Sequence, residues 1–198
     1  GSTGGGTPGN YLGTLTPNPG ADLVLVTTTD QTKLQIYNGS GTLLGDLYTS
    51  GVSNKPSVTD DGTLIVFTNT AGHIIAITLS YAGTNITIEN VQTLSSSPDW
   101  GNVAISKDGR FLAARSKVED NLISVFDFDT NNSKDFALYN PTYSNNGATT
   151  NNVKYADVLE FDYSSTWIMY DAYNELISSQ GQDLSYWDIG FLKFFENN

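Results

Sequence analysis

Asp60-Asp61-Gly62-Thr63-Leu64-Ile65-Val66-Phe67 is the stretch that decides the fold, because the chain repeats it. The same order of residue types returns 47 residues later, counted from Asp61 to Asp108, as Lys107-Asp108-Gly109-Arg110-Phe111-Leu112-Ala113-Ala114. Each copy is a turn followed by an apolar run of strand length. Two more divergent copies are Tyr163-Ser164-Ser165-Thr166-Trp167-Ile168-Met169-Tyr170 and Pro19-Gly20-Ala21-Asp22-Leu23-Val24-Leu25-Val26.

The spacing of these copies predicts the architecture. A unit of about 40 to 50 residues that holds several short strands is typical of β-propeller blades. A continuous apolar run such as Leu64–Phe67 indicates a strand that is covered on both faces. We therefore predict an all-β fold of about four four-stranded blades after a flexible Gly-rich linker at residues 1–10. The blades are expected at approximately 11–50, 51–95, 96–141 and 142–198.

The turns carry a second signal. An Asp-Gly pair in a tight hairpin places its glycine at a positive φ. Gly62 and Gly109 are therefore predicted to adopt left-handed conformations. A single helical turn is predicted at Asp171–Ile177, inside an insertion at Asp171–Asp183 that separates the second and third strands of the fourth blade.

Composition excludes several classes of function. The chain has 21 Asp and Glu against 9 Lys and Arg, and its net charge of −12 opposes binding to nucleic acid. It has no cysteine, which excludes disulfides, thiolate metal sites and a cysteine nucleophile. No apolar run reaches the roughly 20 residues that a membrane-spanning helix needs, so no such segment is predicted.

The N-terminal composition bears on the compartment. Gly1–Asn10 is a flexible linker by composition, and it resembles the tether that follows the lipidated cysteine of bacterial lipoproteins. Such a lipid anchor would lie upstream of residue 1. The Asn- and Thr-rich, Lys-poor composition also suits an exported protein, so we expect a periplasmic, cell-surface or secreted location. A cloning scar followed by an ordinary disordered terminus is the alternative explanation of Gly1–Asn10.

The strand-Asp-Gly-strand units resemble the WD40-like repeats of TolB-type β-propellers. The resemblance is best over Val58–Leu79 and Val103–Phe128, and looser over Leu159–Ile189. It implies a propeller, and its short motif indicates fold far better than function. Six to eight blades are typical of that family, so about four blades imply either a small ring or part of a larger propeller. No Trp-Asp pair closes the first three blades, although Trp187-Asp188 occurs in the fourth.

Candidate binding residues lie before the inner strands, where loops line one mouth of a propeller channel. Ser97-Pro98-Asp99-Trp100 precedes the inner strand of the third blade, and a tryptophan beside an acid can stack on a sugar or anchor a partner. Lys55 and Asp157 occupy similar positions in the second and fourth blades. We predict Asp99, Trp100, Lys55 and Asp157 as binding residues. The alternative for Trp100 is simple packing between blades.

No catalytic constellation is evident. His73 is the single histidine, and no Gly-x-Ser-x-Gly motif is present to hold a nucleophile. Glu160 and Asp162 fall on one face of a strand, as paired acids of a glycosidase would, or are ordinary solvated residues. Asp127–Asp135 has the alternating oxygen ligands of a calcium loop, but lacks its glycine and glutamate, and also suits a plain hairpin turn. No metal and no cofactor are predicted.

These observations lead to one functional hypothesis and one alternative. The first is a non-catalytic exported propeller that binds a protein partner or other copies of itself. It is motivated by the apolar run Ile189–Phe195 and by Tyr11–Thr16, which alternates like a strand ahead of the first blade. The alternative is the propeller portion of a larger, peptidase-like hydrolase whose catalytic domain lies elsewhere.

Overall fold

The computed structural model describes residues 23–83, 85–117, 122–138, 150–156 and 158–194, and all regular structure in these ranges is β-strand. Sheet A contains β1 (Leu23–Thr27), β2 (Leu34–Asn38) and β3 (Leu43–Tyr48). Sheet B contains β4 (Ser57–Val58), β5 (Leu64–Thr68), β6 (Ile74–Ala82) and β7 (Asn85–Ser95). Sheet C contains β8 (Trp100–Ile105), β9 (Phe111–Ser116), β10 (Leu122–Asp127) and β11 (Asn132–Ala137). Sheet D contains β12 (Thr150–Tyr155), β13 (Leu159–Phe161), β14 (Trp167–Ile177) and β15 (Tyr186–Lys193).

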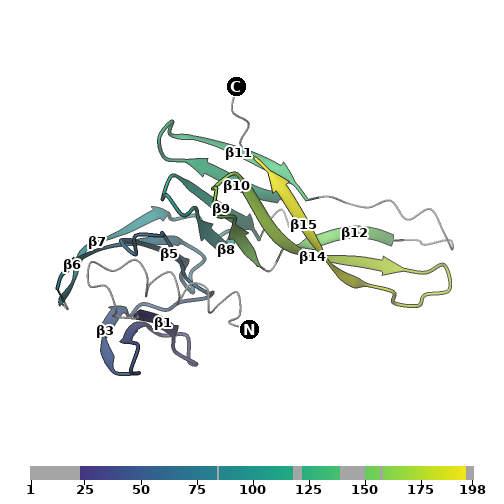
Figure 1. The fold of residues 1–198 in the computed structure, drawn as a ribbon. Helices are drawn as coiled ribbons and strands as arrows, with labels where there is room; N and C mark the ends of the chain where they lie inside the picture. The colour runs from purple at the N-terminus through teal and green to yellow at the C-terminus, as the bar shows by residue number, and fades with distance from the viewer. Residues whose placement is uncertain (1–22, 84, 118–121, 139–149, 157, 195–198) are drawn as a thin grey trace.

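The four sheets follow one another in chain order and stack face against face as an open fan (Figure 1). Every strand pair is antiparallel, as expected for blades built from consecutive hairpins. Within the described residues, no helix is long and apolar enough to cross a membrane.

Three apolar layers hold the fan together. Leu34 and Ile36 of sheet A pack with Ile65 and Phe67 of sheet B in the first layer. The opposite face of the same strand β5 contributes Val66 to the second layer, between sheets B and C. Burying each such side chain is worth about 1.5–3 kcal/mol. The continuous apolar run in β5 is therefore covered on both faces, which confirms the prediction from its sequence.

Strand β9 repeats this arrangement one sheet further on. Leu112 and Ala114 face sheet B, while Phe111 and Ala113 face sheet D in the third layer. Among the described residues, no buried apolar cluster joins sheet D to sheet A. Within the described ranges, the two end sheets are thus covered on one face only.

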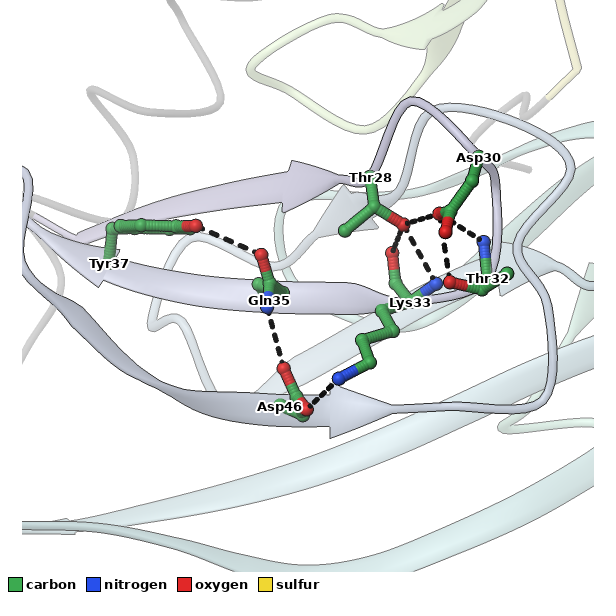
Figure 2. Close-up of polar contacts among 7 residues, drawn as sticks. All are labelled: Thr28, Asp30, Thr32, Lys33, Gln35, Tyr37 and Asp46. Atoms are coloured by element: carbon green, nitrogen blue, oxygen red, sulfur yellow. Dashed lines mark hydrogen bonds and ion pairs between the residues drawn. The ribbon is translucent and has the colours of Figure 1, made fainter.

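A polar turn closes the first hairpin of sheet A (Figure 2). The Thr28 hydroxyl donates to Asp30 Oδ1 at 2.6 Å and accepts the Lys33 amide at 3.0 Å. Asp30 Oδ1 also accepts the Thr32 amide at 3.1 Å. The pKa of Asp30 is lowered to about 2, and the hydrogen bond from Thr28 is the largest cause, followed by those from Thr32. An ionised aspartate therefore organises the turn.

The same turn recurs in the later sheets. Thr59 and Asp61 form it between β4 and β5, and Ser106 and Asp108 form it between β8 and β9. In sheet D, Asp162 accepts the amides of Thr166 and Trp167. Each turn contains one residue with a positive φ, namely Gln31 (58°), Gly62 (70°), Gly109 (80°) and Ser165 (58°). The predicted conformations of Gly62 and Gly109 are confirmed.

The position of the first copy of the repeated segment differs from the prediction. The copy predicted at residues 19–26 begins outside the described residues. The structure instead places the equivalent turn at Thr28–Thr32, after β1. Gln31 occupies the position of the usual glycine there, so the Asp-Gly signal is missing from the sequence. The strand predicted at Tyr11–Thr16 also lies outside the described residues.

The predicted helical turn at Asp171–Ile177 is wrong, because these residues continue strand β14. Ala172, Asn174 and Leu176 are buried, while the residues between them are more exposed. This is the two-residue period of a strand. The predicted insertion at Asp171–Asp183 accordingly shrinks to the turn between β14 and β15. Strands β12 and β13 lie along one edge of β14, and β15 lies along the other.

The turn geometry predicts that Gln31→Gly stabilises the protein. A residue with a side chain is strained at a φ of 58°, whereas glycine adopts it freely. The expected gain in the free energy of unfolding is about 0.5–1 kcal/mol. Chemical denaturation of both proteins measures it.

Gly109→Val is the matched control at the equivalent turn of sheet C. A Cβ added to Gly109 would lie 3.2 Å from Thr59 Cγ2, and a β-branched residue is strained at its φ of 80°. Its unfolding free energy should fall by about 1–3 kcal/mol. Equal stability of the wild type and both variants would show that the two turns do not share the described geometry.

Candidate functional site

A cavity opens where the inner strands of sheets B, C and D converge. It has a volume of about 200 Å³. Residues within or next to β4, β8 and β13 line it, and β8 contacts both β4 and β13. The convergence follows from the sheet order, because the first strand of each hairpin unit lies at the inner end of its blade. The cavity therefore lies at the place where a propeller channel is expected.

A cluster of three charged side chains lines this cavity. Lys55 Nζ lies 2.7 Å from Glu160 Oε1, and Lys107 Nζ lies 3.8 Å from Glu160 Oε2. The Lys107 side chain is only 6% exposed, and this burial lowers the pKa of its ammonium group although Glu160 and Asp60 oppose the shift. Glu160, Asp60 and Asp162 all act on Lys107, so the two lysines of the cavity are balanced by neighbouring carboxylates.

Backbone contacts fix these charges in place. Lys107 belongs to the turn between β8 and β9, and its carbonyl accepts the Asp60 amide at 2.8 Å. The Ser57 hydroxyl accepts the Ile105 amide at 3.0 Å, which ties β4 to β8 just before that turn. The cluster is thus held by the same turns that organise the sheets.

The structure places the four predicted binding residues differently. Lys55 lines the cavity. Asp157 lies outside the described residues, between Ala156 and the lining residue Val158. Asp99 accepts a hydrogen bond from the Ser97 hydroxyl, and neither Asp99 nor Trp100 lines the cavity. Their role in binding stays a prediction.

Trp100 has the contacts of a residue that packs between blades. Its indole nitrogen donates to the Ser95 hydroxyl at 2.8 Å. Its ring meets Phe126 edge to face, with 5.7 Å between centroids, and packs against the apolar layer between sheets B and C. These contacts favour the alternative that the sequence left open for this residue.

Sequence reasoning missed Lys107 and assigned Glu160 a different environment. Glu160 was grouped with Asp162 as a possible acid pair, but Glu160 contacts lysines whereas Asp162 organises a turn. Lys107 lies 53 positions before Glu160, and only the stacking of sheets C and D brings them together. No local pattern in the sequence marks this pairing.

The segment with calcium-loop spacing is a hairpin turn between β10 and β11. Asp127 receives hydrogen bonds from Arg110 Nε at 3.0 Å and Nη2 at 2.8 Å. These bonds lower the pKa of Asp127 to about 2. In the part of the chain that the structure describes, no group of three or more His, Asp or Glu side chains is arranged to hold a metal.

A second surface stands out on sheet D. Trp167 and Met169 of β14 and Trp187, Ile189 and Phe191 of β15 are all exposed. The strand register pairs Met169 with Phe191, and alternation brings all five side chains to the same face of the sheet. This end face, which we call the D face, is the side of sheet D away from sheet C.

Comparison with known proteins identifies the fold. No protein-family model and no curated protein matches the sequence. Among solved structures, the β-propeller domain of Cps50 (Swd1) from Myceliophteria thermophila is similar, with a TM-score of 0.53 and 13% identity. The chain has a β-propeller fold.

The same comparison sets the extent of the likeness. It covers 90% of this chain and 52% of the matched chain, so this chain spans about half the length of that propeller domain. At such low identity the likeness bears on the fold alone. It does not separate a TolB-type repeat from other propeller repeats, and that assignment stays a prediction.

The charged cluster predicts a measurable stability effect. Glu160→Gln removes the carboxylate beside a lysine that is almost fully buried, so the unfolding free energy should fall by about 1–3 kcal/mol. Adding Lys107→Met, which also removes the buried charge, should recover part of that loss. Denaturant titration of the single and double variants measures both effects.

The exposed ion pair Lys33–Asp46 provides the control. Asp46→Asn should cost less than about 1 kcal/mol, because exposed pairs contribute little. If Glu160→Gln has no larger effect than Asp46→Asn, the inner cluster does not hold the blades together.

Proposed function

We propose that this chain is a non-catalytic protein-interaction module that acts outside the cytoplasm. The observation that carries the proposal is the D face. Monomeric soluble proteins rarely expose a contiguous apolar patch of more than a few hundred Å², and larger patches mark interaction sites. Tryptophan and phenylalanine, which dominate this face, are the residues that most often anchor protein interfaces.

The chemistry of the described residues supports a binding role over a catalytic one. Four carboxylates are engaged in contacts with other groups: Glu160 with two lysines, Asp127 with Arg110, and Asp30 and Asp162 with turn amides. None of them contacts a second acid in the way that a glycosidase pair requires. We expect no turnover of peptide, ester or glycoside substrates by this chain.

The extracytoplasmic location rests on composition. The Gly-rich residues 1–10, the scarcity of lysine and the absence of cysteine suit an exported protein, tethered by a lipid anchor upstream of residue 1 or freely secreted. Protease treatment of intact cells that make the whole protein tests this. Degradation on intact cells, or on cells whose outer membrane alone has been opened, supports the proposal. Protection that lasts until the cytoplasmic membrane is lysed contradicts it.

The alternative function is the propeller portion of a larger hydrolase. The observation that favours it is that this chain spans only about half of the matched propeller. In that case the same end face would pack on further parts of the enzyme, and the chain itself would still lack a catalytic site.

A photo-activated cross-linking residue at Ile189 tests the interaction directly. Ile189 is 64% exposed at the centre of the D face, so illumination should join it to a protein, either a partner from the native cell or a second copy. Phe191→Asp in the same chain should abolish the product. Mass spectrometry of the adducts reads out the result.

Val91 provides a matched control position. It is an exposed apolar residue, 47% accessible, but it lies on β7 of an interior sheet. Adducts that form equally from Val91 and Ile189, or from neither, would contradict the assignment of the D face as the interaction surface.

A further inference from the structure

The end strands have the continuous apolar sequences that are typical of strands buried on both faces. The interior strands β5 (Leu64-Ile65-Val66-Phe67) and β9 (Phe111-Leu112-Ala113-Ala114) are continuous apolar runs, and both of their faces are covered. The end strand β14 begins with the same kind of run, Trp167-Ile168-Met169-Tyr170, yet only Ile168 and Tyr170 are buried. The uncovered half of this run is part of the D face.

Strand β1 at the other end of the fan has the same property. In Leu23-Val24-Leu25-Val26, Leu23 and Leu25 pack toward sheet B, while Val24 is 40% and Val26 37% exposed. The register places Tyr37 opposite Val24 and Gln35 opposite Val26. This side of sheet A, away from sheet B, is called the A face.

The A face is also ordered by polar contacts (Figure 2). Tyr37 donates to Gln35 at 2.9 Å, Gln35 donates to Asp46 at 2.7 Å, and Lys33 lies 2.7 Å from Asp46. The side chains of this row hold one another in place, so this part of the A face is preorganised. Val24 and Val26 lie beside the row. Preorganised side chains lose less conformational entropy when a partner binds.

Neither end face is strongly charged, although the chain as a whole is acidic. The D face carries Lys193, whose ammonium lies 6.0 Å from the Trp167 ring centroid, and Asp171 in register with Ile189. Alternation along β14 places Glu175 on the same face. The A face carries Lys33 and Asp46. Asp30, in the turn beside Lys33 (Figure 2), adds a further carboxylate next to the A face. Each face therefore places one lysine among carboxylates, so contact between the two faces can bring opposite charges together despite a net charge of −12 per copy.

We infer that the D face of one copy packs on the A face of a second copy, and that two copies close a ring of eight sheets. This inference rests on the proposed interaction function and names the partner. Each interior layer already joins one sheet to the following sheet, and a D-to-A contact would continue that series. Because the chain spans about half of the matched propeller, two copies supply the sheets of one ring. Eight blades lie within the range of known propellers.

The area of the D face is consistent with this contact. Trp167, Trp187 and Phe191 are each about half exposed. Since an aromatic side chain can bury about 150–250 Å², the three together leave roughly 300 Å² of surface open to a partner. Met169 and Ile189 add to this. A closed ring contains the D-to-A contact twice, so both contacts together approach the size of a standard protein interface.

Two single variants and one control test the contact by sedimentation velocity and light scattering. The wild type should have twice the 21.4 kDa mass of the chain at high concentration. Phe191→Asp on the D face and Val26→Lys on the A face should each weaken the dimer at least roughly 30-fold, as loss of an interface hot spot does. Val91→Asp, on an interior sheet, should remain dimeric. Circular dichroism and thermal melting establish that every variant is folded.

Mixing the two single variants tests the head-to-tail arrangement. A dimer of one Phe191→Asp copy and one Val26→Lys copy contains one unchanged contact and one contact with Asp against Lys. The mixture should therefore dimerise more tightly than either variant alone. A Val26→Lys variant that dimerises like the wild type would instead indicate contact between two D faces and would overturn the arrangement. Growth into larger assemblies would overturn ring closure.

The outcomes separate this inference from the proposed function. A wild type that stays monomeric at every concentration overturns the second copy as partner. If Ile189 then still cross-links to another protein, and Phe191→Asp abolishes that product, the interaction function stands with a different partner. A strict monomer with no cross-linked product from Ile189 overturns both.

Discussion

The face-to-face burial of neighbouring sheets is the constraint on which the rest of this structure depends. Strands such as β5 and β9 carry apolar side chains at consecutive positions, and such strands are stable only when both faces are covered. Sheets B and C meet this requirement through their neighbours. Among the residues that the structure describes, sheets A and D meet it on one side only, and the exposed residues Trp187, Ile189 and Phe191 are the consequence. The proposed interaction function and the proposed ring both rest on this one requirement.

The polar turns give the sheets their register. A slip of one residue in a strand would move its whole apolar set to the opposite face. In this chain an aspartate fixes the start of each central strand by accepting backbone amides, as Asp30 does for Thr32 and Asp162 does for Trp167. The same turns bring Lys107 to the inner end of the blades, beside Glu160. Register, layer packing and the charged cavity are therefore linked through short local motifs.

The sequence predicted those features that depend on local chemistry. The apolar run Leu64–Phe67 indicated a doubly covered strand, and the Asp-Gly pairs indicated the conformations of Gly62 and Gly109. The turn at Asp30 was missed because Gln31 stands where glycine is usual. The helical turn predicted at Asp171–Ile177 was wrong because the polar Asn174 on the buried face and the apolar Ile177 on the opposite face hide the two-residue period. The pairing of Lys107 with Glu160 depends on the stacking of two sheets, which no local pattern encodes.

The tryptophans of the D face allow the most direct test of the requirement that both faces be covered. In a protein carrying Trp100→Phe, Trp167 and Trp187 are the remaining tryptophans, and both belong to the end face. Acrylamide quenching of their fluorescence should be weak in concentrated protein and should increase on dilution, with emission moving to longer wavelength as the face is uncovered. Strong quenching that is the same at every concentration, in a folded protein and in the presence of its native partners, would contradict the account.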